Sequence, residues 1–138
     1  MIKLVYWERR SKTHQRFVRA LRYVGDTWPR LSGLVRNIYA TKNPPSGWHS
    51  KKASIRGCAK IRMNRLERDI WVRKVEGRTA DQYVRTLVHE LYHLFQTRNM
   101  SNRQLNIRHS LRGGSKEKYE SEAWRMGELA AKRFRSGL

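Results

Sequence analysis

Apolar residues recur along the first third of the chain at spacings that predict its secondary structure. Residues 2–8 alternate between two faces and predict a strand. Apolar positions at helical spacing predict a helix over residues 13–24 and a second helix that begins at Pro29 and continues to Ile38. The next segment, residues 43–47, contains two prolines and a glycine and predicts a turn.

The rest of the chain shows two short strand patterns and two longer helical ones. Alternating residues predict strands over residues 59–66 and 69–75. An apolar stripe predicts a helix over residues 79–97, and a second helical pattern covers residues 117–135. The polar residues 98–116 between these helices predict a long loop, and long loops in small domains are often functional.

These elements and a length of 138 residues predict one α+β domain spanning residues 1–138. Hydrophobic residues make up 38% of the chain, which is enough for a folded core in spite of the high charge. The 31 Lys and Arg residues outnumber the 11 Asp and Glu residues, and the net charge is +20. Such a charge favours polyanions, either nucleic acid or a membrane surface, and non-specific nucleic acid is the expected partner. A generic cationic surface without a partner would have the same composition.

The sequence also lacks several features. The single cysteine, Cys58, excludes an internal disulfide and a cysteine-rich zinc site. No stretch approaches the roughly 20 apolar residues of a membrane span, and the first residues lack a continuous apolar run of signal-peptide length. The chain is therefore expected to work in a reducing, cytoplasmic setting, without a transmembrane segment.

The helix expected over residues 79–97 carries the pattern His-Glu-Leu-Tyr-His at positions 89–93. Residues four apart share a helix face, so the imidazoles of His89 and His93 project together and can bind one Zn²⁺ ion. Glu90 lies one position round the helix, where its carboxylate can take a proton from a zinc-bound water and return it to a leaving group. The pattern predicts a catalytic zinc site with Glu90 as general base. The alternative is a helix with two ordinary histidines.

A catalytic zinc site needs a third protein ligand, which leaves one position for water. Several acidic or imidazole side chains follow the pattern at 89–93, and the need for a ligand alone does not choose among them. The downstream candidates are His109, Glu117, Glu120, Glu122 and Glu128.

Two segments together resemble the gluzincin zinc metallopeptidases: the pattern at 89–93 and Tyr-Glu-Ser-Glu-Ala at 119–123. The resemblance covers about residues 60–135 and is nearest to the minigluzincins and to the phage-repressor-cleaving and radiation-response type. It implies a small zincin-like domain, in which N-terminal helices and a short sheet pack on the metal-binding helix and the C-terminal helix carries the third ligand. In that family the ligand is a Glu with a small residue three positions later, which Glu120 with Ala123 matches.

One position departs from the family pattern. Many relatives carry Asp or Asn four residues after the ligand Glu, where it accepts a hydrogen bond from a metal-binding His, but this chain has Trp124, whose indole only donates. Either another group orients the histidines, or the site is less well oriented. Ala123 and Gly127 would let the last helix approach the metal-binding helix closely. The family also implies that residues 69–75 present a strand edge to an extended substrate.

Three side chains are candidates to stabilise the oxyanion of a tetrahedral intermediate: Tyr92, His109 and Tyr119. The expected function is a zinc-dependent metallopeptidase that acts on or near nucleic-acid-associated proteins. A zinc-dependent nuclease is the first alternative, because an activated water attacks phosphorus as well as carbonyl carbon. A non-catalytic nucleic-acid-binding protein with a structural zinc is the second, but it leaves Glu90 without a role.

Overall fold

The structure, a computed structural model, describes residues 3–5, 11–43, 45, 57–62, 67–98 and 114–137. It has an α+β fold, as predicted. None of the helices in these ranges is long and apolar enough to cross a membrane. The elements in chain order are β1 (Lys3–Val5), α1 (Lys12–Thr27), α2 (Pro29–Ser32), β2 (Asn37–Thr41), β3 (Gly57–Arg62), β4 (Glu67–Arg73), α3 (Ala80–Gln96) and α5 (Gly114–Arg135).

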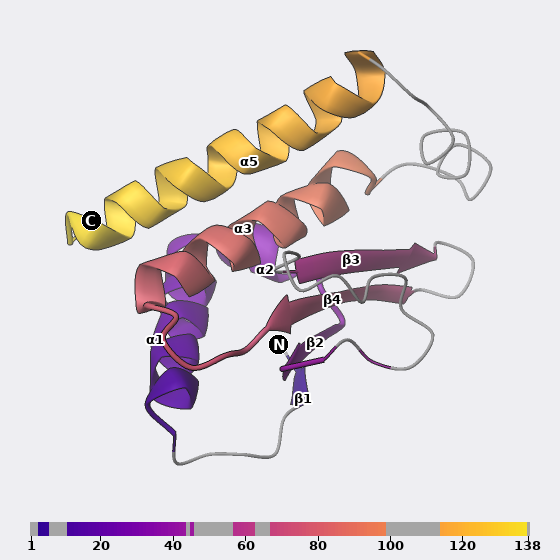
Figure 1. Cartoon of the computed structure of the whole chain (residues 1–138). Coiled ribbons are helices and arrows are strands. Elements are labelled where there is room, and N and C mark those ends of the chain that lie inside the picture. Colours follow the sequence, from indigo (N-terminus) through magenta and orange to yellow (C-terminus); the bar gives the residue numbers. More distant parts are fainter. Residues whose placement is uncertain are drawn as a thin grey trace.

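The described strands form one sheet in the order β1-β2-β4-β3. β2 is parallel to both of its neighbours, β1 and β4, whereas β3 is antiparallel to β4. Ile38 and Ala40 of β2 and Ile70 and Val72 of β4 are buried. α3 lies between the sheet and α5, and α1 packs on α3 (Figure 1). The buried apolar face of the sheet thus supports the helix that carries the His-Glu-Leu-Tyr-His pattern.

The predicted substrate-binding edge at residues 69–75 is wrong. β4 pairs with β2 through residues 69–73 and with β3 through residues 67–72, so its backbone groups already serve two neighbours. β3 lies at the edge of the sheet formed by the described strands and contacts α3. The prediction failed because the strand nearest to the metal-binding helix in sequence need not be the outermost strand of the sheet.

The predicted helix from Pro29 to Ile38 is also wrong in its second half. α2 ends at Ser32, and Ile38 lies in β2, where it pairs with Leu4 of β1 and Ile70 of β4. The buried and partly exposed residues of β2 alternate, which is the pattern of a strand covered on one face. Backbone pairing on both sides of β2 therefore outweighs a weak helical spacing of apolar residues.

α1 places its apolar face against α3. Its N-cap residue, Ser11, accepts a hydrogen bond from the backbone N–H of His14 at 3.1 Å. Phe17, Ala20 and Val24 are fully buried, as the helical spacing predicted. The ring of Phe17 meets the ring of Tyr83 of α3 edge to face, with centroids 5.5 Å apart.

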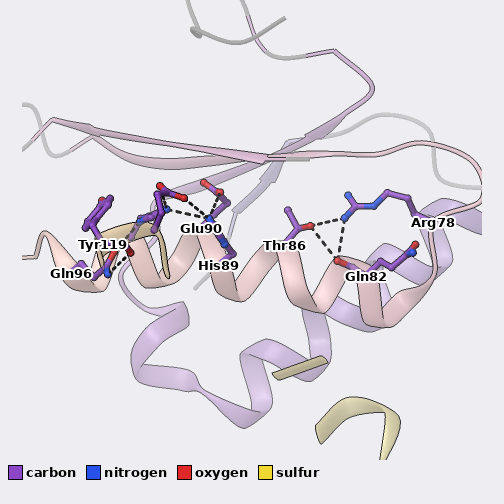
Figure 2. A network of polar contacts seen from close by, with 9 residues as sticks. Arg78, Gln82, Thr86, His89, Glu90, Gln96 and Tyr119 are labelled. Atoms are coloured by element: carbon purple, nitrogen blue, oxygen red, sulfur yellow. Dashed lines mark hydrogen bonds and ion pairs between the residues drawn. The ribbon is translucent and has the colours of Figure 1, made fainter. Parts of the chain in front are cut away.

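α3 begins at the predicted capping motif. The side chain of Gln82 accepts a hydrogen bond from the backbone N–H of Thr79 at 2.9 Å. The buried guanidinium of Arg78 donates to the carbonyl of Arg73 at 2.7 Å and also to Thr86 (Figure 2). These bonds connect the end of β4 to the first turns of α3, so the sheet fixes where α3 starts.

α5 runs antiparallel to α3 and approaches it closely. A Cβ atom on Gly127 would lie 2.7 Å from the carbonyl oxygen of Arg85, so the two helices leave no room for a side chain there. Ala123 is fully buried in the same interface. Ion pairs flank the contact, from Arg85 to Glu128 at 2.6 Å and from Arg135 to Asp81 at 3.0 Å. The close approach predicted from the two small residues is therefore present.

Candidate metal centre

Three side chains from α3 and α5 meet at one point. The Nε2 atoms of His89 and His93 lie 3.2 Å apart, as their spacing of one helical turn predicted. Glu120 of α5 places Oε1 3.0 Å from His93 Nε2 and Oε2 3.4 Å from His89 Nε2. One candidate ligand atom from each residue lies within 4.8 Å of the other two, so this group could hold a metal ion.

The distances within the group are short enough for the three side chains to share one ion. Zinc ligands at 2.0–2.2 Å from a tetrahedral ion would lie about 3.3–3.6 Å from one another. The two Nε2 atoms are 3.2 Å apart, and Glu120 reaches them with different oxygens, Oε1 to His93 at 3.0 Å and Oε2 to His89 at 3.4 Å. Two imidazoles and a carboxylate are also a donor set that zinc accepts in catalytic sites. The described residues could therefore hold a metal ion.

Glu90 lies beside this group without belonging to it (Figure 2). Its Oε1 is 3.7 Å from His89 Nε2, and only 5% of the residue is exposed. Burial raises the pKa of Glu90 to about 7; the neighbouring Glu120 acts in the same direction and His89 opposes it. A carboxyl group with a pKa near neutrality can accept and return a proton at neutral pH.

Glu120 has the opposite electrostatic setting. Hydrogen bonds from His89 and His93 hold the pKa of its carboxyl well below its usual range, although half of the side chain is exposed. The carboxylate is thus kept ionised, which is the form that binds a metal ion. The two carboxyl groups of the site therefore differ in their pKa: that of Glu90 is raised, and that of Glu120 is lowered.

Gln96 orients His93, a role that the sequence reasoning missed. Its Oε1 atom lies 2.9 Å from His93 Nδ1, while its Nε2 donates to the backbone carbonyl of Tyr119 at 2.9 Å (Figure 2). A proton fixed on Nδ1 leaves Nε2 free to bind a metal. Gln96 thus supplies the acceptor that Trp124 cannot provide. The sequence could have indicated this contact, because Gln96 follows His93 by three residues and therefore lies on the same face of the helix.

The other predicted ligands contact different groups or lie outside the described residues. Glu122 accepts a hydrogen bond from Gln96 at 3.2 Å, and Glu128 pairs with Arg85. His109 is outside the part of the chain that the structure describes, and so is the side chain of Glu117. Among the acidic residues whose side chains are described, Glu120 is the one that joins the histidine pair.

The predicted oxyanion donors have separate surroundings. The ring of Tyr119 stacks on His93, with centroids 4.5 Å apart. Tyr92 instead stacks on Phe95 and lines an apolar pocket together with Trp28 of the α1–α2 junction. Tyr119 is therefore the described candidate in direct contact with a ligand of the metal centre, whereas His109 lies outside the described residues.

A pocket of about 520 Å³ opens next to Glu120. It is lined along α5 by Glu120, Ser121, Trp124, Arg125 and Glu128. Trp124 is 59% exposed, so its indole is available to another molecule and is not part of the core. The position that departs from the family pattern thus forms one wall of the space beside the candidate ligand.

Comparison of this chain with protein-family models, with curated proteins and with solved structures finds no match. Any functional assignment therefore rests on the chemistry and geometry of the described residues.

Proposed function

We propose that this chain is a zinc-dependent metallopeptidase with a zincin-like active site. His89, His93 and Glu120 would hold Zn²⁺, and Glu90 would be the general base. The observation that supports the proposal most is the placement of a buried carboxylate, 3.7 Å from His89 Nε2, beside three side chains that could hold a metal ion. A purely structural zinc would need the three ligands and would leave Glu90 without a function.

The residues around the centre divide the work of hydrolysis. Bound zinc would act as a Lewis acid and lower the pKa of a water molecule held next to Glu90. Glu90 would take a proton from that water and return it to the leaving amine, since its carboxylate lies beside the candidate ligands without being one of them. Gln96 keeps the Nε2 atom of His93 directed at the centre. The pocket beside Trp124 would seat a substrate side chain.

An extended peptide suits this site better than a phosphodiester. Apart from the metal, the pocket next to the centre offers a phosphate one cation, Arg125, because Glu120 would be a metal ligand and Glu128 pairs with Arg85. β3, at the edge of the described sheet and in contact with α3, would pair with the substrate backbone in place of residues 69–75. Substrates associated with nucleic acid are the proposed targets because the chain carries a net charge of +20.

The proposal is tested by Glu90→Gln, with Glu76→Gln as the matched control because Glu76 is an exposed turn residue. Zinc content is measured by metal analysis, and hydrolysis is followed with an unfolded protein and with DNA. Glu90→Gln should retain zinc and lose about 10²–10⁴-fold of the peptidase activity, while Glu76→Gln should match the wild type. DNA cleavage that depends on Glu90 would favour the nuclease. Bound zinc without either activity would favour a structural role for the metal.

A further inference from the structure

Basic residues line the solvent-facing side of α1. Lys12, Arg19 and Arg22 are exposed, and Arg16 between them is half-buried. Their spacing of three to four residues places them on one face of the helix, opposite to the buried Phe17. Lys12 stands in the first turn of α1, which has no acidic residue to offset the positive end of the helix dipole. This side of α1 therefore carries a row of cations on a rigid support.

The last turn of α5 packs against this side of α1. Phe134 packs against Tyr23 of α1, with ring centroids 4.9 Å apart, and the guanidinium of Arg19 lies 5.0 Å from the Phe134 ring centroid. We call Lys12, Arg19 and Arg22 the basic face.

Most of the described carboxylates lie away from the basic face. Asp69 pairs with Arg36, and Asp81 pairs with Arg135. Glu120 belongs to the candidate metal centre, and Glu90 lies beside it. The single acidic residue of α1, Asp26, stands four residues after Arg22 and offsets one of the three charges of the basic face, which keeps a positive excess.

We propose that the basic face binds the phosphate backbone of nucleic acid without sequence preference. The helical rise from Lys12 to Arg22 is about 15 Å. One strand of a duplex carries a phosphate about every 3.4 Å of axis, so this length faces roughly four phosphates. α1 presents no large apolar side chain on this side: the exposed ones among the described residues are Phe95, Trp124 and Leu129, on α3 and α5.

The side chains of the basic face favour nucleic acid over an anionic membrane or an acidic protein as the partner. A helix that inserts into an anionic membrane needs Trp, Phe or Leu side chains beside its cations. A stable interface with an acidic protein would have an apolar centre. The basic face offers cations alone, which is what non-specific backbone binding uses.

The basic face also lies apart from the metal centre. The helical rise along α5 between Glu120 and Phe134, whose ring Arg19 contacts, is about 20 Å. Nucleic acid bound at this face would therefore hold the protein near its target and would not place a phosphodiester at Glu90. The proposal goes beyond the peptidase activity and is independent of zinc, so its test can fail or succeed without deciding the catalytic function.

The test is fluorescence anisotropy with a labelled random-sequence duplex DNA, titrated at several salt concentrations. The variant Arg19→Gln/Arg22→Gln removes two cations from the basic face. Lys42→Gln/Lys118→Gln removes two exposed cations outside it and is the charge-matched control. Arg19→Lys/Arg22→Lys keeps the charge. Circular dichroism of each variant checks the fold, because Arg19 contacts Phe134.

Three phosphate contacts predict a slope of about −2.7 for log K against log salt, and the loss of two contacts reduces its magnitude by about 1.8. The affinity at 0.1 M salt should then fall by about 60-fold in Arg19→Gln/Arg22→Gln and stay within about threefold of wild type in the control and in the lysine variant. Equal losses in the glutamine variant and its control would overturn the proposal. No binding to DNA at low salt, or binding only to phosphatidylserine vesicles, would also overturn it.

Discussion

Replacing Glu90 by Gln should stabilise the metal-free protein at neutral and alkaline pH. Glu90 is 5% exposed, and burial raises its pKa from 4.5 to about 7. Ionised Glu90 is therefore less favourable in the folded protein than in the unfolded chain, where water solvates it. Gln has nearly the same size and stays neutral, so the variant avoids the cost of burying a charge. Catalytic residues often reduce stability in this way.

The sign and the pH range follow from proton linkage. Between pH 4.5 and about 7 the folded wild type binds more protons at Glu90 than the unfolded chain, so its free energy of unfolding falls as the pH rises. The difference between a pKa of 4.5 and a pKa of about 7 corresponds to about 3 kcal/mol, reached above pH 7. Below pH 4.5 the carboxyl is protonated in both states, and wild type and variant should differ little.

Urea unfolding of the chelator-treated protein at pH 4, 6 and 8 measures this difference. Glu90→Gln should exceed wild type by about 3 kcal/mol at pH 8, by roughly half as much at pH 6, and by little at pH 4. Glu76→Gln, in an exposed turn, should follow wild type at each pH. A difference between Glu90→Gln and wild type that does not depend on pH would refute the assignment of the effect to ionisation of Glu90.

Two further predictions concern the contact between α3 and α5. In metal analysis, Glu120→Ala should lose zinc. Glu122→Ala, which removes one hydrogen-bond acceptor of Gln96, should keep zinc near the wild-type level. If Glu122→Ala lost zinc and Glu120→Ala kept it, Glu122 would be the ligand. Gly127→Ala should cost about 1–3 kcal/mol in urea unfolding and weaken zinc binding, because the new methyl group meets the α3 backbone. In the control Gly25→Ala, the new methyl group on α1 meets no atom, so this variant should stabilise the protein by about 0.5–1 kcal/mol. Equal changes in the free energy of unfolding for Gly127→Ala and Gly25→Ala would contradict the close packing of α3 and α5.

The sequence by itself determined the local features of the centre. The helical repeat is fixed by backbone geometry, so positions 89 and 93 had to share a face wherever the helix lay. The capping residue Thr79 and the apolar stripe after it marked the helix correctly, and the helix near the C-terminus was also predicted. These features depend on residues within one or two turns of each other, which is why periodicity and capping rules could predict them.

Only the tertiary structure decided which distant groups meet the histidines. Glu120 joins them because Gly127 and Ala123 let α5 approach α3, and this distance depends on packing across two helices. Family resemblance pointed to Glu120, whereas the residue types alone left His109 and four glutamates open. Gln96 was overlooked, although its spacing from His93 was visible, because its second contact is a backbone carbonyl of α5.

The sheet shows the same limit. Ile38 carries an apolar side chain that fits a helix or a strand, and it became part of β2 because β1 and β4 offer backbone partners on both sides. Residues 69–73 were predicted correctly as a strand but wrongly as an edge, since the order of strands is set by long-range pairing. The local spacing of residues favours a conformation for each segment, whereas burial and backbone pairing with distant segments decide which segments become neighbours. A candidate site that joins two helices depends on the local conformation and on the long-range packing.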